Sequence, residues 1–131
     1  MFENLAVFRT AYAMARHAGA RQQVVAQNMA NADTPGFRAK DVTPFSAFIA
    51  QQGQDRFAAH QTRPLHILGS RADRLTTPRM IADDGPINPN GNSVSLETEM
   101  LKAVDVKRQH DRAITIYKSA LGILRSSLGR S

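Results

Sequence analysis

The four histidines, His17, His60, His66 and His110, are the side chains of this chain best suited to bind a metal or to move a proton. Histidine ligands on one helix stand three or four positions apart, and no pair here has that spacing. The chain has no cysteine, so it offers no thiolate ligand, no cysteine nucleophile and no disulfide bond. The sequence therefore predicts neither a metal site nor a cofactor.

The sequence also lacks the common catalytic and phosphate-binding motifs. No G-x-S-x-G turn presents a serine, and no G-x-G-x-x-G or Walker loop could hold a phosphate. The acidic pair Asp83-Asp84 opens the run Asp83–Pro86, whose residue types favour a turn. Glu97 and Glu99 fit the first turn of a helix, where negative charge is favourable. We therefore expect no enzymatic activity and predict no catalytic residue.

Charge is spread along the chain and forms no block. Lys and Arg number 17 against 11 Asp and Glu, which gives a formal net charge of +6. Nucleic-acid binding requires clustered basic residues with stacking aromatic side chains, and neither cluster is present. The basic residues of the C-terminal segment are interrupted by Asp105 and Asp111, unlike those of a membrane-surface helix. We expect no nucleic-acid partner.

The first residues lack the features of a cleaved export signal. Met1-Phe2-Glu3-Asn4 has no basic region followed by an apolar run. No segment approaches the roughly 20 apolar residues of a membrane span. We expect a protein that does not span a membrane, and any export from the cytoplasm would use a route that reads no cleaved signal.

Two apolar stripes, one near each end, have the alternating four-and-three spacing of a coiled-coil seam. All six prolines lie between them. The predicted fold class is therefore mainly α, with helices over about Phe2–Ala30 and from an N-cap at Ser95 onward forming a coiled-coil-like pair. The stripe residues that we expect at assembly interfaces are Leu5, Phe8, Tyr12, Met29, Leu96, Met100, Ile114, Tyr117, Leu121, Leu124 and Leu128.

One polar position interrupts the second stripe. His110 falls on it beside Lys107. A polar layer that sets the register of the paired helices is the interpretation that this position favours. A pH switch is the alternative, because histidine titrates near neutral pH.

The central segment, residues 35–92, is predicted to be irregular, between an N-terminal helical region (1–34) and a C-terminal one (93–131). A short helix is expected over Pro44–Gln51, with Thr43 as its N-cap. Short strands or a hairpin are expected at Leu65–Leu68 and Met80–Ala82.

The first helix runs into a sharply specified corner. The residue before a proline is pushed out of the α region, so Thr34 is expected to stop the helix. Thr34-Pro35-Gly36-Phe37 predicts a type II turn, with a positive φ at Gly36. The side chains of Asn31 and Asp33 are expected to bond backbone groups at the helix end.

This corner resembles the signature of bacterial flagellar rod, hook and hook-associated axial proteins. In those proteins a heptad helix precedes an Asn-x-x-Asn-x-x-Thr-Pro-Gly-aromatic corner, and a second heptad helix lies at the C-terminus. The motif residues here are Asn28, Asn31, Asp33, Thr34, Pro35, Gly36 and Phe37, with Phe37 where tyrosine is commoner. The segments Met1–Leu5, Asn90–Met100 and Leu121–Arg125 are similar to those of the proximal rod proteins.

The resemblance implies a structural subunit of the flagellar basal-body rod that self-assembles with other axial proteins and transmits torque for motility. It implies synthesis in the cytoplasm, export by the flagellar type III system and a place in the periplasmic rod. The implied partners are other rod subunits, the MS-ring/rod junction protein and the export gate. The alternative is a soluble coiled-coil adaptor or export chaperone that does not polymerise. Broad apolar faces on a small chain favour assembly, because partner subunits must cover them.

Overall fold

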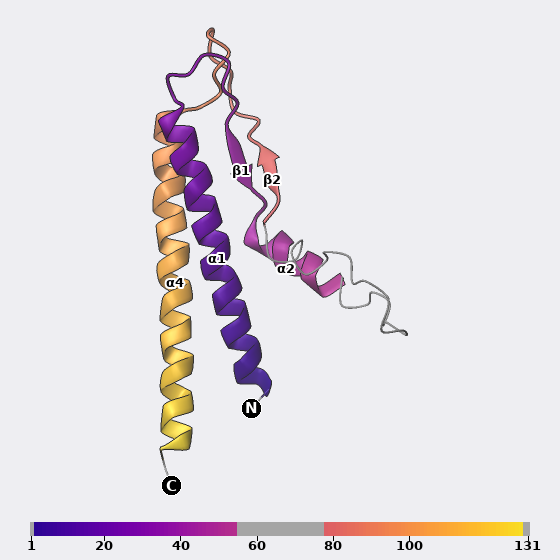
Figure 1. Cartoon of the computed structure of the whole chain (residues 1–131), viewed down its shortest axis with the longest axis vertical. Coiled ribbons are helices and arrows are strands. Elements are labelled where there is room, and N and C mark those ends of the chain that lie inside the picture. Colours follow the sequence, from indigo (N-terminus) through magenta and orange to yellow (C-terminus); the bar gives the residue numbers. More distant parts are fainter. Residues whose placement is uncertain (1, 55–77, 130–131) are drawn as a thin grey trace, which may run out of the picture.

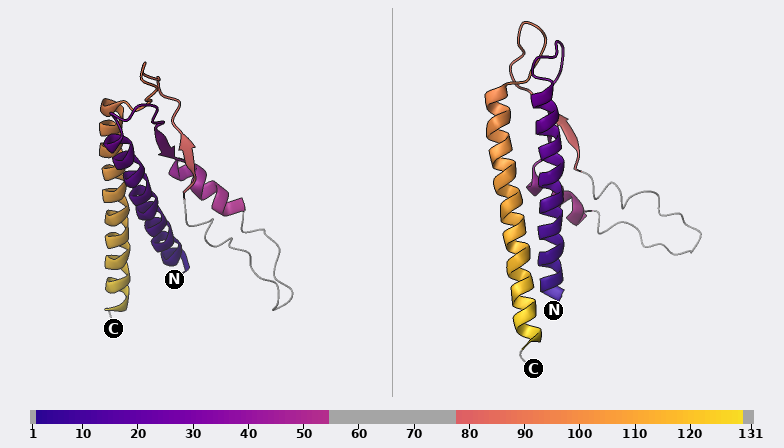
Figure 2. Two further views of the ribbon diagram at one scale, coloured as in Figure 1. Left: turned by 45° about the horizontal axis from the view of Figure 1, so that its top comes forward. Right: turned by 60° about the vertical axis from the view of Figure 1, so that its left-hand side comes forward.

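Two long antiparallel helices and a smaller arm make up the computed structural model, which describes residues 2–54 and 78–129 (Figure 1). The elements are α1 (Phe2–Ala30), β1 (Lys40–Val42), α2 (Phe45–Gln54), β2 (Met80–Ala82) and α4 (Leu96–Leu128). Both ends of the chain lie at the same end of the helix pair (Figures 1 and 2). The mainly α fold class is confirmed. In the described ranges no helix is both long enough and apolar enough to cross a membrane.

The start of α4 follows from its first residues. The Ser95 hydroxyl accepts a hydrogen bond from the backbone N–H of Thr98 at 3.5 Å, which satisfies one of the free donors of the first turn. Glu97 and Glu99 lie in that turn and Arg125 in the last one, as the helix dipole favours. The predicted N-cap is confirmed.

The seam between α1 and α4 is made of small residues. Its buried positions recur every seven residues: Ala11, Ala18 and Val25 on α1, and Val106, Ala113 and Ala120 on α4. Ala11, Ala113 and Ala120 each stand one position before a predicted stripe residue: Tyr12, Ile114 and Leu121. The helix pair is confirmed, but the residues buried between its helices are these small ones and not the larger stripe residues.

The stripe residues consequently line the edges of the pair. Phe8 and Tyr117 make an edge-to-face contact across the two helices, with ring centroids 5.2 Å apart. His110 does not enter the seam. It is exposed and lies with Lys107 in an open groove of about 670 Å³ between the helices, beside Gly19 and Ala26. The polar register-setting layer predicted at His110 is therefore not found between α1 and α4.

The arm, made of β1, α2 and β2, packs against α1 (Figures 1 and 2), and Asp41 of β1 also lies 3.8 Å from Lys102 of α4. β1 and β2 pair antiparallel, with Asp41 opposite Ile81. Phe48 of α2 is buried, and its ring lies 5.9 Å from that of His17 on α1. His17 is itself buried, and its Nε2 lies 2.6 Å from the Thr43 carbonyl.

Three predictions for the central segment have different outcomes. The short helix is confirmed, although it begins one residue later than predicted, at Phe45, and extends to Gln54. The strand at Met80–Ala82 is confirmed, and its partner is β1, whereas Leu65–Leu68 lies outside the described residues. The turn at Asp83–Pro86 is wrong. No turn forms there; instead the Asp83 N–H donates to the Ala39 carbonyl at 3.1 Å, which prolongs the strand pairing by one bond.

Candidate functional site

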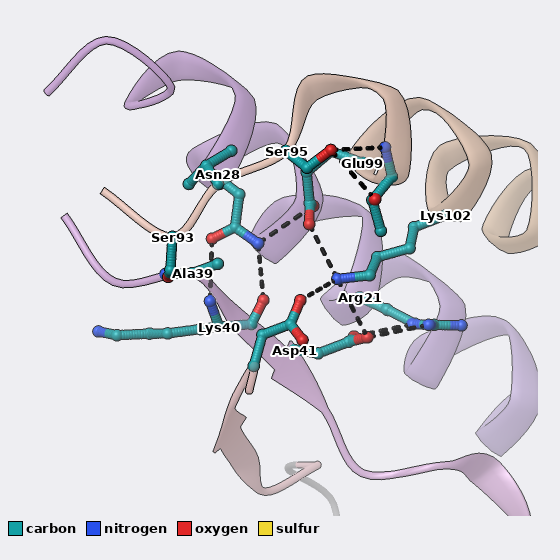
Figure 3. A network of polar contacts seen from close by, with 12 residues as sticks. Arg21, Asn28, Ala39, Lys40, Asp41, Ser93, Ser95, Glu99 and Lys102 are labelled. Atoms are coloured by element: carbon teal, nitrogen blue, oxygen red, sulfur yellow. Dashed lines mark hydrogen bonds and ion pairs between the residues drawn. The ribbon is translucent and has the colours of Figure 1, made fainter. Parts of the chain in front are cut away.

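The most densely bonded part of the described structure is the region where α1 ends and α4 begins. We call residues 28–42 and 83–102 the junction. Figure 3 shows its inner half, where side chains from α1, β1 and α4 point toward one another. Every buried side-chain nitrogen and oxygen in the described ranges has a hydrogen-bond partner. In so small a protein, a fully satisfied buried network specifies one arrangement of the elements.

The corner after α1 has the predicted turn. The Phe37 N–H donates to the Thr34 carbonyl at 3.2 Å, and Gly36 has a φ of +74°. The Asn31 amide donates to the Gln27 carbonyl at 2.8 Å, and the Thr34 hydroxyl donates to the Asn31 side chain at 3.3 Å. Helix α1 spans Phe2–Ala30, as predicted; the Asn31 N–H still donates to the Gln27 carbonyl at 3.2 Å, whereas the Ala32 N–H donates three residues back, to the Met29 carbonyl at 3.3 Å.

A second asparagine, Asn92, joins this corner to the segment that precedes α4. Its side chain has no exposed surface. Its Nδ2 group donates to the carbonyls of Asn31, Ala32 and Thr34 at 2.8–2.9 Å. Its Oδ1 accepts the Val94 N–H at 2.7 Å. Carbonyls at a helix end have no hydrogen-bond partner within the helix. The Asn92 amide supplies the donor for three such carbonyls.

Two glycines allow the corner and this segment to meet. The Gly36 N–H donates to the Asn90 carbonyl at 3.0 Å. Gly91 has a φ of +81°, and a Cβ on it would lie 3.3 Å from the Gly36 Cα. A side chain at position 91 would therefore be strained and crowded at once. The Ser93 N–H completes the pairing by donating to the Phe37 carbonyl at 3.0 Å.

Asn28, the first motif residue, holds β1 against α1. Its Oδ1 accepts the Lys40 N–H at 3.1 Å, and its Nδ2 donates to the Lys40 carbonyl at 2.6 Å. The amide thus pairs with both backbone groups of one residue, as a neighbouring strand would. The same Nδ2 donates to Glu99 Oε2 on α4 at 3.1 Å, so one buried side chain connects three elements (Figure 3).

Charged groups extend this network toward the arm. The Glu99 carboxylate is buried and accepts a hydrogen bond from the Lys102 ammonium at 2.8 Å. Lys102 also donates to Asp83 and lies 3.8 Å from Asp41. Arg21 donates two hydrogen bonds to Asp41, at 2.9 and 3.0 Å. Lys102 therefore stands among three carboxylates, which joins α4 to both strands of the arm.

These contacts shift the acid–base equilibria. Burial alone would raise the pKa of Asp41, but hydrogen bonds from Arg21 and from the Val42 N–H, with the nearby positive charges, lower it below its ordinary value. Burial would lower the pKa of Lys102, yet its hydrogen bonds to Asp83 and Glu99 and their charges raise it.

Acid should therefore weaken the junction. Because the pKa of Asp41 is lower in the folded chain than in the unfolded chain, its contribution to stability is complete above the unfolded pKa and disappears as the pH falls through the folded one. We expect the free energy of unfolding to fall between about pH 5 and pH 2. In Asp41→Asn it should fall less steeply. Urea denaturation followed by far-UV circular dichroism measures both.

The matched control is Asp111→Asn, because Asp111 forms an exposed ion pair with Lys107. Its pH dependence should follow that of the wild type. A curve for Asp41→Asn that runs parallel to the wild-type curve would show that Asp41 contributes nothing in this range.

The predicted residues have two kinds of position. The motif residues all lie in the junction, where Asn28 is buried, Asn31 and Phe37 are half-buried, and the others are exposed: Asp33, Thr34, Pro35 and Gly36. The expected interface residues are spread along the flanks of the helices. Exposed are Tyr12, Leu96, Met100, Tyr117 and Leu128, and half-buried are Phe8, Met29, Ile114, Leu121 and Leu124. Leu5 lies on α1 outside the residues whose side chains are described.

Sequence reasoning missed three residues of the junction: Asn92, Glu99 and Lys102. Asn92 lies in the run Asn88–Asn92, whose five residues are all of types common in turns. Its residue type alone therefore did not single it out. The signal for Glu99 is its place on the buried heptad position, seven residues before Val106. An acidic residue at such a position requires a buried partner.

Known proteins share the corner of the junction and much of the rest of the chain. A family model described as flagella basal body rod protein matches residues 13–38, from the middle of α1 through the corner. A flagellar basal body rod protein FlgB from Agrobacterium fabrum is 36% identical over 119 residues, which cover 86% of this chain and 85% of the relative. The chain belongs to the FlgB family of flagellar basal body rod proteins.

Other members of the FlgB family are similar over the same extent. The FlgB protein of Aeromonas hydrophila is 31% identical over 114 residues, covering 83% of both chains. That of Escherichia coli is 31% identical over 120 residues, covering 81% of this chain and 83% of the relative. The likeness thus extends well beyond the motif and includes residues from both long helices.

Proposed function

We propose that this chain is a structural subunit of the proximal part of the flagellar basal-body rod and that it helps to transmit torque for motility. The observation that supports this most strongly is family membership combined with a bonded junction at one end of an apolar-flanked helix pair. Such a unit can carry load, because relative movement of α1, β1 and α4 would have to break buried hydrogen bonds.

The exposed apolar side chains support assembly with other subunits. On α4 alone, Met100, Leu101 and Val104 are each more than half exposed. Side chains of this size that remain exposed in groups are typical of surfaces that other proteins cover. We propose other rod subunits, the MS-ring/rod junction protein and the flagellar export gate as the partners that cover them.

The same proposal includes the route to the rod. The chain is made in the cytoplasm and leaves it through the flagellar type III system without a cleaved signal. No metal, cofactor or catalytic residue has a part in this function. A soluble adaptor or chaperone with the same helices is the competing function, and it would remain in the cytoplasm.

A charge placed on the α4 stripe should prevent incorporation into the rod. We expect Leu121→Asp to abolish motility and to remove the protein from purified basal bodies, because an aspartate cannot be buried between subunits without a partner. Met100→Asp should also reduce motility and the amount of the protein in purified basal bodies. Met100 is 52% exposed, so this variant leaves the fold of the single chain unchanged.

The control is Ser119→Asp, which places the same charge at an exposed position on another side of α4. It should be incorporated normally. Full motility of both Leu121→Asp and Met100→Asp, with both chains present in basal bodies, would exclude the stripe as an assembly surface.

A further inference from the structure

Helix α4 carries two exposed patches of opposite charge along one face. The head ridge consists of Glu97, Met100, Leu101, Val104 and Asp105. Its three apolar side chains are 52%, 69% and 55% exposed, respectively. The tail ridge consists of Lys118, Leu121, Gly122 and Arg125, of which Leu121 is half-buried and the others are exposed. In the described part of the chain, α4 packs against α1, and every side chain of the two ridges except the half-buried Leu121 remains exposed (Figures 1 and 2).

The two ridges have matching positions. Glu97 and Lys118, Leu101 and Gly122, and Val104 and Arg125 are each 21 residues apart. This spacing is three heptads, so both members of a pair lie on the same side of a coiled helix. A second α4 in parallel orientation, displaced by 21 residues, would therefore bring a head ridge against a tail ridge.

Charge and shape are complementary between the ridges. Glu97 gives the head ridge a negative charge, whereas Asp105 already lies 4.0 Å from Arg108; Lys118 and Arg125 make the tail ridge basic. Within α4, residues 112–128 carry no acidic side chain at all. Leu101 is the most exposed apolar residue of the head ridge, and it would face Gly122, where a Cβ would meet nothing within 4 Å. A glycine inside a helix costs about 1 kcal/mol relative to alanine, and nothing inside this chain uses the space at Gly122.

We propose that the tail ridge of one copy of this chain packs on the head ridge of a second copy, with the helices parallel and displaced by about 30 Å. This inference rests on the proposed function, because subunits of an axial structure share one direction. The contact joins two different surfaces, so each copy in a pair keeps one free ridge. Further copies can therefore add to both ends of the assembly. Two neighbours on one side are then about 60 Å apart, which exceeds the roughly 50 Å length of α4, so both fit.

Cysteine cross-linking tests the displacement, because the chain has no cysteine of its own. In the variant Leu101→Cys/Gly122→Cys, oxidation of the concentrated full-length protein should give a ladder of covalent dimers, trimers and longer species. The matched controls are the single variants Leu101→Cys and Gly122→Cys, which should give no ladder, because identical positions of two displaced copies lie about 30 Å apart. Salt at about 0.5 M should reduce the ladder several-fold, since opposite charges hold the ridges together.

Two results would overturn the inference. Covalent dimers without longer species would mean that two copies pair antiparallel and close on themselves. Covalent dimers from either single-cysteine variant, in the yield that the double variant gives, would mean unspecific collision. The same variant in purified basal bodies separates this inference from the proposed function. If the chain is present there but not cross-linked to itself, the displaced contact is wrong and the rod function stands. If the chain is absent, the rod function fails.

Discussion

Replacing Asn92 by aspartate is expected to lower the free energy of unfolding by about 3 kcal/mol, among the largest effects of any single change in the described chain. The substitution keeps the shape of the side chain but replaces the Nδ2 donor by an oxygen. Three carbonyls, those of Asn31, Ala32 and Thr34, would then face an acceptor instead of a donor. The side chain has no exposed surface, so water cannot replace the lost bonds.

Urea denaturation followed by far-UV circular dichroism measures this effect. Asn92→Ala should also be destabilised, but less, because it removes the donor without adding a buried charge. Asn88→Ala is the matched control, since Asn88 is exposed and the bonds of its backbone survive the change. It should lie within about 0.5 kcal/mol of the wild type. Equal midpoints for Asn92→Asp and Asn88→Ala would contradict the role given to Asn92.

Asn28→Asp is expected to have an effect of similar size, with a characteristic pH dependence. The new carboxylate would lie beside the Glu99 carboxylate and the Lys40 carbonyl, where the amide now donates at 3.1 and 2.6 Å. We expect a loss of about 3–4 kcal/mol at neutral pH, because a buried charge is left against two acceptors. Protonation of the new carboxyl restores a donor, so the difference from the wild type should shrink as the pH falls from about 7 to about 5.

The second asparagine of the motif provides the control. Asn31 is half-buried, and its amide donates only to the Gln27 carbonyl one turn earlier. Asn31→Asp should therefore cost about 1 kcal/mol or less. If the deficit of Asn28→Asp were small, or constant between these pH values, the contact of Asn28 with Glu99 would not matter for stability.

The helices were predictable from the sequence, whereas the contacts between them were not. Proline positions and the 3.5-residue repeat determine where α1 and α4 lie, since both are local properties. The side of each helix that becomes buried depends on how closely the two backbones approach. Ala18 and Ala113 are buried between the two helices although alanine is small. The predicted stripe followed larger apolar residues such as Ile114, one position away.

The junction was predictable only where its chemistry is local. The turn at Gly36 follows from the Pro-Gly pair, which has one preferred backbone shape. The role of Asn92 depends on carbonyls about 60 positions earlier in the chain, and no local rule connects them. The same holds for β1, a three-residue strand with one buried apolar residue, Val42. It forms because Asn28 and β2 bond its two edges.

The most direct test of the account is the amount of this chain in purified basal bodies compared with the cytoplasm. Quantitative mass spectrometry of both fractions from flagellated cells should find it enriched in the basal bodies in a fixed ratio to other rod proteins, and Met100→Asp should abolish that enrichment. A chain found only in the cytoplasm of motile cells would contradict a structural role in the rod and favour the adaptor.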